Sequence, residues 1–244
     1  MSNMLIRPQN YAQNLLAVRT RLALAAARHG RSPDSVTLLA VSKGQPAAAV
    51  LSVADLGVEN FGENYLQEAL PKIDALAGRR LAWHFIGPLQ ANKTRPIAER
   101  FAWVHTLDRL RVAERLAAQR PHYAPDLNVC IQVKLGGEAL KSGAAPEAVA
   151  DLATAVAALP RLKLRGLMCL PPPETDPARQ RFWFAQLRHL YETLNAQALA
   201  LDTLSMGMSA DLEAAVAEGA TIVRIGTALF GPRPDPPGGA RSAP

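Results

Sequence analysis

Residues 38–43 read Leu38-Leu39-Ala40-Val41-Ser42-Lys43, a short apolar run that ends in a lysine. A run of this kind is typical of a fully buried strand. An isolated lysine at the end of such a strand usually reaches into water. A lysine that is partly desolvated there instead loses proton affinity and becomes a nucleophile at neutral pH. The rest of the chain decides between these two interpretations of Lys43.

The same alternation of an apolar run and a helical pattern recurs along the 244 residues. We predict eight strands, at residues 37–43, 60–64, 81–87, 101–106, 127–135, 162–170, 203–208 and 221–230. Helical patterns lie at residues 11–27, 46–56, 65–76, 90–100, 108–119, 146–159, 177–199 and 210–218. Strands that alternate with helices pair in parallel through right-handed crossovers. Eight such units predict an α/β protein with a single (β/α)8 TIM barrel and an extra N-terminal helix.

A doubly wound open sheet is the main alternative to the barrel. The strand count and the absence of G-x-G-x-x-G after the first strand favour the barrel. We predict that the barrel spans residues 8–231. Residues 232–244 are rich in Pro and Gly and are predicted to form a disordered tail.

Composition narrows the function class. The net charge is +6, but the basic residues form no dense run, so the sequence does not indicate a nucleic-acid partner. No stretch approaches the roughly 18 apolar residues of a membrane span, and the N-terminus shows no signal-peptide pattern. Cys130 and Cys169 lie in apolar runs without metal-ligand spacing, which favours a reducing compartment and no metal. We therefore expect a cytoplasmic protein.

Polar residues gather at the C-terminal ends of the predicted strands, where barrel active sites form. The candidates for a ligand site are Lys43, Asn64, His84, Ser205, Ser209, Arg224, Gly226 and Thr227. The mouths of strands seven and eight frequently bind phosphate, since small residues expose backbone N–H groups and hydroxyls add donors. Ser205, Gly226 and Thr227 fit that task. Two simpler roles remain open, Ser209 as the N-cap of the next helix and Gly226 as a packing residue.

Arg224 lies inside an otherwise apolar strand. Arginine is almost never fully buried without a partner, so Arg224 either pairs with an acidic group such as Glu63 or faces a ligand. The amide of Asn64 could flank an oxygen of an aromatic ligand. His84 stands between two aromatic residues, as a satisfied core histidine or as a ligand contact.

An imine-forming lysine, a phosphate site and a strand-borne arginine together predict pyridoxal 5′-phosphate as the cofactor. The arginine would face the pyridine nitrogen. Because arginine does not release its proton, it would leave that nitrogen unprotonated. The cofactor would then be a poor electron sink, which disfavours broad carbanion chemistry.

Five motifs carry a specific resemblance, at residues 40–43 (AVSK), 61–65 (FGENY), 83–93 (WHFIGPLQANK), 204–209 (LSMGMS) and 223–227 (VRIGT). With their spacing, they resemble the pyridoxal phosphate homeostasis protein family, also called the proline synthase co-transcribed homologue family. The resemblance implies a barrel like the N-terminal domain of alanine racemase, the third fold type of pyridoxal phosphate proteins. It implies a cofactor held as a Schiff base on Lys43.

The resemblance also assigns roles to the other candidates. Ser205, Gly226 and Thr227 would contact the phosphate, Arg224 the pyridine nitrogen, and Asn64 would lie near the ring. The implied function is to bind, buffer or deliver the cofactor in vitamin B6 and amino-acid homeostasis, without established catalysis. Pyridoxal phosphate-dependent apo-enzymes are the implied partners, and we expect a monomer.

Two enzyme functions remain as alternatives. The first is a racemase-like enzyme that uses the cofactor, with Tyr65 or Tyr123 as the candidate for its second base. We do not expect the β-domain that alanine racemases append, because only 14 residues follow the eighth strand. The second is a cofactor-free aldolase, which gives Arg224 no clear task. Lys134 stands where the family commonly has Asn, and it could bind an anion or compete for the aldehyde.

Overall fold

The structure, a computed structural model, describes residues 10–136 and 142–232. Eight parallel strands close into a barrel in sequence order, and β8 pairs with β1. The strands are β1 (Thr37–Val41), β2 (Asn60–Glu63), β3 (Ala82–Phe85), β4 (Trp103–Leu107), β5 (Leu127–Val133), β6 (Leu162–Cys169), β7 (Thr203–Ser205) and β8 (Ile222–Ile225). The predicted (β/α)8 barrel is confirmed. The predicted tail lies outside the described residues from residue 233 onward.

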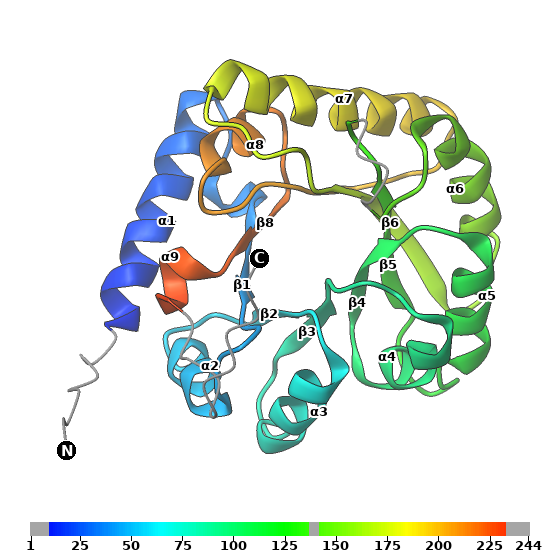
Figure 1. Cartoon of the computed structure of the whole chain (residues 1–244), viewed down its shortest axis with the longest axis horizontal. Helices are drawn as coiled ribbons and strands as arrows, with labels where there is room; N and C mark the ends of the chain where they lie inside the picture. Colours follow the sequence, from blue (N-terminus) through cyan, green and yellow to red (C-terminus); the bar gives the residue numbers. More distant parts are fainter. Residues whose placement is uncertain (1–9, 137–141, 233–244) are drawn as a thin grey trace, which may run out of the picture.

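Helices surround the barrel (Figure 1). The α-helices are α1 (Tyr11–Arg28), α2 (Ala47–Ala54), α3 (Leu66–Ala75), α4 (Thr94–Arg100), α5 (Leu110–Gln119), α6 (Val149–Ala157), α7 (Pro177–Ala196), α8 (Leu212–Ala217) and α9 (Thr227–Phe230). Short 3-10 turns lie at η1 (Pro33–Ser35), η2 (Ala91–Lys93) and η3 (Pro146–Ala148).

The extra helix α1 packs against the last two helices of the barrel, α8 and α9. The side chain of Asn10 caps it by accepting from the backbone N–H of Gln13. Its buried residues, Leu15, Val18 and Leu22 among them, face the interior, and α1 packs against α8 and α9 (Figure 1). The Nδ2 of Asn14 donates to the carbonyl of Leu229 in α9 at 2.9 Å. Helix α1 therefore helps to fix the segment that follows β8.

Several predicted boundaries differ from those of the structure, and two of the differences have a clear backbone cause. The last strand was expected to run through residues 221–230, but β8 ends at Ile225 and α9 follows. The carbonyl of Gly226 accepts from the N–H groups of Leu229 and Phe230 at 3.0 and 2.9 Å, which turns the chain into a helix. Helix α7 stops at Ala196, short of the predicted residue 199, because Ala198 adopts a φ of 63°.

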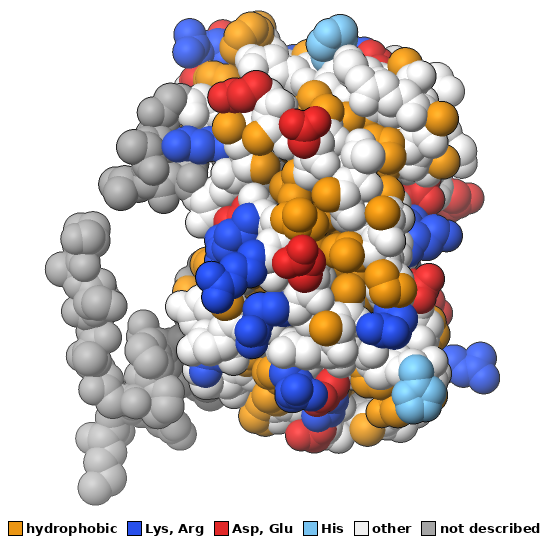
Figure 2. All heavy atoms as spheres, turned by 90° about the vertical axis from the view of Figure 1, so that its right-hand side faces the viewer, with side chains coloured by type: hydrophobic (Ala, Val, Ile, Leu, Met, Phe, Trp, Pro, Cys, Tyr) orange, Lys and Arg blue, Asp and Glu red, His pale blue; other side chains and the backbone are white. Residues whose placement is uncertain are grey.

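The outer surface carries mixed charge. Figure 2 shows basic and acidic side chains interspersed with apolar ones on the face that carries α5 and α6. Within the described ranges, no helix is long and apolar enough to cross a membrane, and no cluster of His, Cys, Asp and Glu could hold a metal ion. Cys130 and Cys169 are buried free thiols, and burial raises the pKa of each to about 12.

Candidate functional site

A cavity of about 330 Å³ opens at the C-terminal ends of the strands. It contains six of the eight predicted site residues, namely Lys43, Asn64, Ser209, Arg224, Gly226 and Thr227. The remaining lining is mostly apolar, from Val41, Ile86, Met168, Leu170, Met208 and Ala210. Segments that are far apart in sequence thus converge on one site because parallel strands end at the same face of the barrel.

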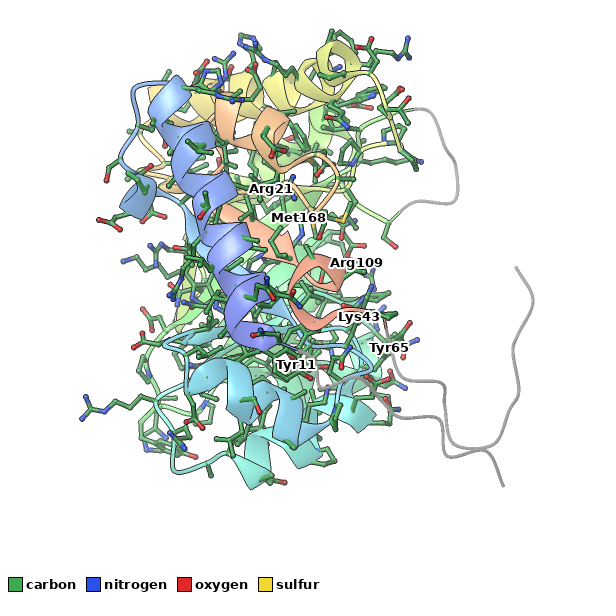
Figure 3. All side chains as sticks on the ribbon, turned by 90° about the vertical axis from the view of Figure 1, so that its left-hand side faces the viewer. Tyr11, Arg21, Lys43, Tyr65, Arg109 and Met168 are labelled. Atoms are coloured by element: carbon green, nitrogen blue, oxygen red, sulfur yellow. The ribbon has the colours of Figure 1, made fainter. Side chains whose placement is uncertain are left out.

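Lys43 follows β1 directly at this mouth. The N–H of Ser42 donates to the carbonyl of Gly62 at 3.0 Å, which continues the β1–β2 ladder, and Gly44 then turns the chain with a φ of 71°. The Lys43 side chain is half-buried. In Figure 3, Lys43 lies beside α9 and towards the same end of the barrel as Tyr65.

A buried ion pair anchors the strand end that carries Lys43. Glu63 is fully buried, and its Oε1 accepts from Lys72 Nζ at 2.7 Å and from Ser42 Oγ at 2.5 Å. Lys72 Nζ also donates to the carbonyl of Ser42 at 2.8 Å. Burial raises the pKa of the Glu63 carboxyl, and Lys72 and Ser42 oppose that shift. Lys72 was not among the residues predicted to matter, and Glu63, one of the two predicted alternatives for Arg224, pairs with Lys72 instead.

Arg224 is buried in the barrel interior and lines the cavity. Its Nη1 donates to the carbonyl and to the Oγ of Ser205 at 2.6 and 2.9 Å, and its Nη2 donates to the carbonyl of Cys169 at 2.8 Å. Within the described residues no carboxylate bonds to Arg224, and its Nε–H and one Nη2–H have no acceptor. Burial lowers the pKa of the guanidinium, and Asp211 opposes this only electrostatically. The buried guanidinium of Arg224 thus borders the cavity with unused hydrogen-bond donors.

Of the three residues predicted to contact a phosphate, Gly226 and Thr227 line the cavity, whereas Ser205 is fully buried and accepts a hydrogen bond from Arg224. The site candidate Ser209 also lines the cavity. Helix α8 begins at Leu212 with Asp211 in the N-cap position, so Ser209 is not the cap. A Cβ on Gly226 would come no closer than 3.4 Å to its neighbours, so close packing does not require glycine there.

His84 is absent from the described lining of the cavity and lies deeper in the barrel. Its Nδ1 lies 2.9 Å from Nε2 of His105, and its Nε2 lies 3.0 Å from Oδ1 of Asn60. The Nδ1 of His105 lies 2.8 Å from Ser205 Oγ. His105 was not among the residues predicted from the sequence. Its spacing of two residues from Trp103 was the available signal, because residues two apart in a strand share a face.

A second cavity of about 230 Å³ adjoins the first, and both are lined by Asn64, Ile86 and Leu170. Lys134 lines this second cavity with Thr106 and Gln132. The Oδ1 of Asn64 is buried without a hydrogen-bond partner in the described structure. A ligand that donates a hydrogen bond at this junction would satisfy it.

Comparison with known proteins places the chain in a family. Residues 13–234 match the family model described as alanine racemase, N-terminal domain. A pyridoxal phosphate homeostasis protein from Pseudomonas aeruginosa is 60% identical over 222 residues, which cover 91% of this chain and 95% of that protein. The chain belongs to the pyridoxal phosphate homeostasis protein family. A second member of this family, from Escherichia coli K12, is 52% identical over 225 residues, or 91% of this chain and 96% of that protein.

Solved structures agree with this family assignment. PipY of Synechococcus elongatus, determined with pyridoxal phosphate bound, superposes with a TM-score of 0.80 at 38% identity, over 91% of this chain and 100% of that chain. Alanine racemase from Corynebacterium glutamicum superposes with a TM-score of 0.68 at 18% identity, over 93% of this chain and 64% of that chain. The likeness to the racemase shows the fold that the homeostasis family shares with it.

Proposed function

We propose that the chain binds pyridoxal 5′-phosphate in the 330 Å³ cavity, holds it as a Schiff base on Lys43, and acts in vitamin B6 and amino-acid homeostasis. The relatives named for pyridoxal phosphate homeostasis and the cofactor-bound PipY structure support this proposal. When bound, the cofactor supplies an aldehyde that an amine can capture reversibly. The residues of the chain bind it, orient it and determine how readily it leaves.

Arg224 carries the proposal. A buried guanidinium without a bonded carboxylate is costly unless a ligand uses its remaining donors. The pyridine nitrogen is a neutral acceptor of the kind that such a donor fits. A cofactor-free aldolase would give this arginine no clear task.

The rest of the lining fits the remaining parts of the cofactor. Ile86, Met168 and Leu170 offer apolar surface for a planar ring. The hydroxyls of Ser209 and Thr227 and the backbone at Gly226 offer donors for a phosphate. The orphaned amide oxygen of Asn64 suits a hydroxyl or ammonium donor beside the ring.

The lining supports a holder of the cofactor more than a racemase. Racemisation needs a base on each face of the substrate carbon. Among the described lining residues, Lys43 is the side chain able to serve as a base. Tyr65 is exposed and lines a different pocket. Tyr123 is exposed in the α5–β5 connection, which lies at the opposite end of the barrel.

We also propose that the protein works in the cytoplasm as a monomer and passes the cofactor to pyridoxal phosphate-dependent apo-enzymes. Release by transfer of the imine to an incoming amine would suit this role, because it needs no second base.

The first experiment locates the covalent anchor. The chain is loaded with pyridoxal phosphate, reduced with borohydride and mapped by peptide mass spectrometry. We expect visible absorbance before reduction and the added mass on Lys43, and we expect Lys43→Arg to abolish both. Lys134→Arg is the matched control at the adjoining cavity and should change neither. A label on Lys134, or a colourless wild-type protein, would contradict the proposal.

The second experiment separates a holder from an enzyme. The loaded protein is incubated with amino acids in deuterium oxide, and the exchange of the α-proton is followed by NMR. We expect no exchange above that of free cofactor. Sustained exchange that disappears in Lys43→Arg would establish the racemase-like alternative.

A further inference from the structure

Polar side chains fill part of the barrel interior, where Val, Ile and Leu are the usual residues. A continuous chain of close contacts joins Asn60 of β2, His84 of β3, His105 of β4, Ser205 of β7 and Arg224 of β8. The four separations are 3.0, 2.9, 2.8 and 2.9 Å in that order. This hydrogen-bond chain therefore links Arg224, at the cavity, to Asn60 at the start of β2, towards the opposite end of the barrel.

The groups at the two ends of this hydrogen-bond chain determine which atom donates in each of its bonds. Arg224 can only donate, and the Oδ1 of Asn60 can only accept. Arg224 donates to Ser205 Oγ, so the single hydroxyl proton of Ser205 is available to Nδ1 of His105. His105 then donates from Nε2 to Nδ1 of His84, and His84 donates from Nε2 to Asn60. A second proton on His84 would set two N–H groups face to face, and a second proton on His105 would point at a Ser205 Oγ that already accepts from Arg224. Each imidazole is therefore a neutral Nε2–H tautomer.

Burial reinforces this protonation state. Both histidines are buried, and desolvation lowers the pKa of His84 to about 3 and that of His105 well below its usual value. The neighbouring His84 and the Arg224 guanidinium also lower the pKa of His105. The tautomers thus persist across the physiological pH range.

Aromatic packing fixes the rings. The imidazole of His84 stacks on Trp103 with ring centroids 5.4 Å apart and an interplanar angle of 5°. The guanidinium of Arg165 covers Trp103 at 4.8 Å from the ring centroid and bonds to Oδ1 of Asn128 at 2.8 Å. His84 therefore presents its Nδ1 to His105 from a constrained position.

We infer that His105, supported by His84, is a positioning residue for Arg224. By accepting the Ser205 proton, His105 keeps the lone pairs of Ser205 Oγ directed at Arg224. Two Nη1 bonds to Ser205 and one Nη2 bond to Cys169 then hold the guanidinium in place at the lining of the cavity, with its remaining N–H groups not bonded to any described residue. The identity of the ligand rests on the proposed function, whereas the hydrogen-bond chain belongs to the protein itself.

The experiment compares two substitutions at one position. His105→Asn places an amide near the former Nδ1, where its oxygen can still accept from Ser205, whereas His105→Leu offers no acceptor. We expect His105→Leu to weaken pyridoxal phosphate binding about tenfold, the effect of one hydrogen bond to a charged group. It should also shift the visible absorbance of the bound cofactor, because Arg224 no longer holds the pyridine nitrogen in one geometry. His105→Asn should restore most of both properties.

A cofactor-free measurement accompanies the binding series. Long-range ¹H–¹⁵N spectra of the apo protein should show His84 and His105 as neutral Nε2–H tautomers. In His84→Leu, His105 loses its acceptor, and the His105 signals should shift while the fold persists by circular dichroism.

The outcomes separate the two ideas. A colourless wild type with the expected tautomers would refute the proposed function and leave the hydrogen-bond chain standing. A coloured His105→Leu with wild-type affinity and spectrum would overturn the positioning role. Equal loss in His105→Asn and His105→Leu, together with an equal fall in melting temperature, would also overturn it, because general damage to the core would then explain the effect.

Discussion

At the residue scale, the ion pair of Glu63 and Lys72 stands out because it is buried beside the strand end that carries Lys43. It joins the ends of β1 and β2 to α3, through Ser42 and through Glu63 itself. Removing one partner of a buried pair leaves an uncompensated charge, which costs far more than the net value of the pair. The strand end that carries Lys43 thus depends on Lys72, which lies in α3, two helices further along the chain.

We expect Lys72→Met to lower the free energy of unfolding by about 3–5 kcal/mol in urea titrations, since Glu63 keeps its buried charge. The double variant Lys72→Met with Glu63→Gln should recover part of the loss, because no ion remains. Arg79→Met removes the exposed pair with Asp55 and should cost about 0–1 kcal/mol. If Lys72→Met and Arg79→Met lowered the free energy of unfolding equally, burial of the Glu63–Lys72 pair would have no effect on its contribution to stability.

At the element scale, close backbone contact between β2 and β3 shapes the mouth of the barrel. A Cβ on Gly87, just after β3, would stand 1.9 Å from the carbonyl oxygen of Asn64, just after β2. The carbonyl of Gly87 also accepts from Thr106 Oγ1 at 2.6 Å, so the glycine segment cannot simply move aside. Glycine is therefore required here by packing of backbone on backbone.

We expect Gly87→Ala to destabilise the protein by about 1–3 kcal/mol or more, the usual cost of overpacking. Cofactor affinity should also fall, because the displaced strand end carries Asn64. Gly78→Ala is the control, since a Cβ there meets nothing within 4 Å. Thermal melts and cofactor titrations measure the two effects, and a neutral Gly87→Ala would refute the tight contact.

At the scale of the whole molecule, the buried neutral histidines couple stability to pH. The pKa of His84 falls from 6.5 to about 3 on folding, and that of His105 falls well below 6.5. Between these values and 6.5 the unfolded chain binds protons that the folded chain does not. Their contribution to stability is therefore complete above pH 6.5 and is lost progressively as the pH falls through that window.

We expect the free energy of unfolding to decrease below pH 6.5 by about 1.4 kcal/mol per pH unit for each of the two histidines. Urea titrations at several pH values measure the slope. The double variant His84→Asn with His105→Asn should flatten it, while His122→Asn, at an exposed position, should not. An unchanged slope in the double variant would assign the acid sensitivity to other groups.

The barrel itself could be predicted from the sequence because strand and helix periodicity are local properties. Eight apolar runs between helical patterns predicted the strand count, and parallel pairing then placed the strand ends on one face. The end of β8 could not be predicted in this way, because residues 222–230 are mainly apolar and the chain nevertheless turns into α9 at Gly226. In an apolar segment of that length, the pattern of residues does not distinguish a buried strand from a buried helix.

The sequence by itself determined the fold, the family motifs and the convergence of Lys43 and Arg224 on one cavity. Only the tertiary structure decided the partners of the buried polar groups: Glu63 bonds to Lys72, Ser205 lies beneath Arg224, and the hydrogen-bond chain runs through His105. These contacts join residues up to 100 positions apart across the barrel interior. Hydrogen-bond partners depend on distances of a few tenths of an ångström between such residues, which local periodicity does not specify.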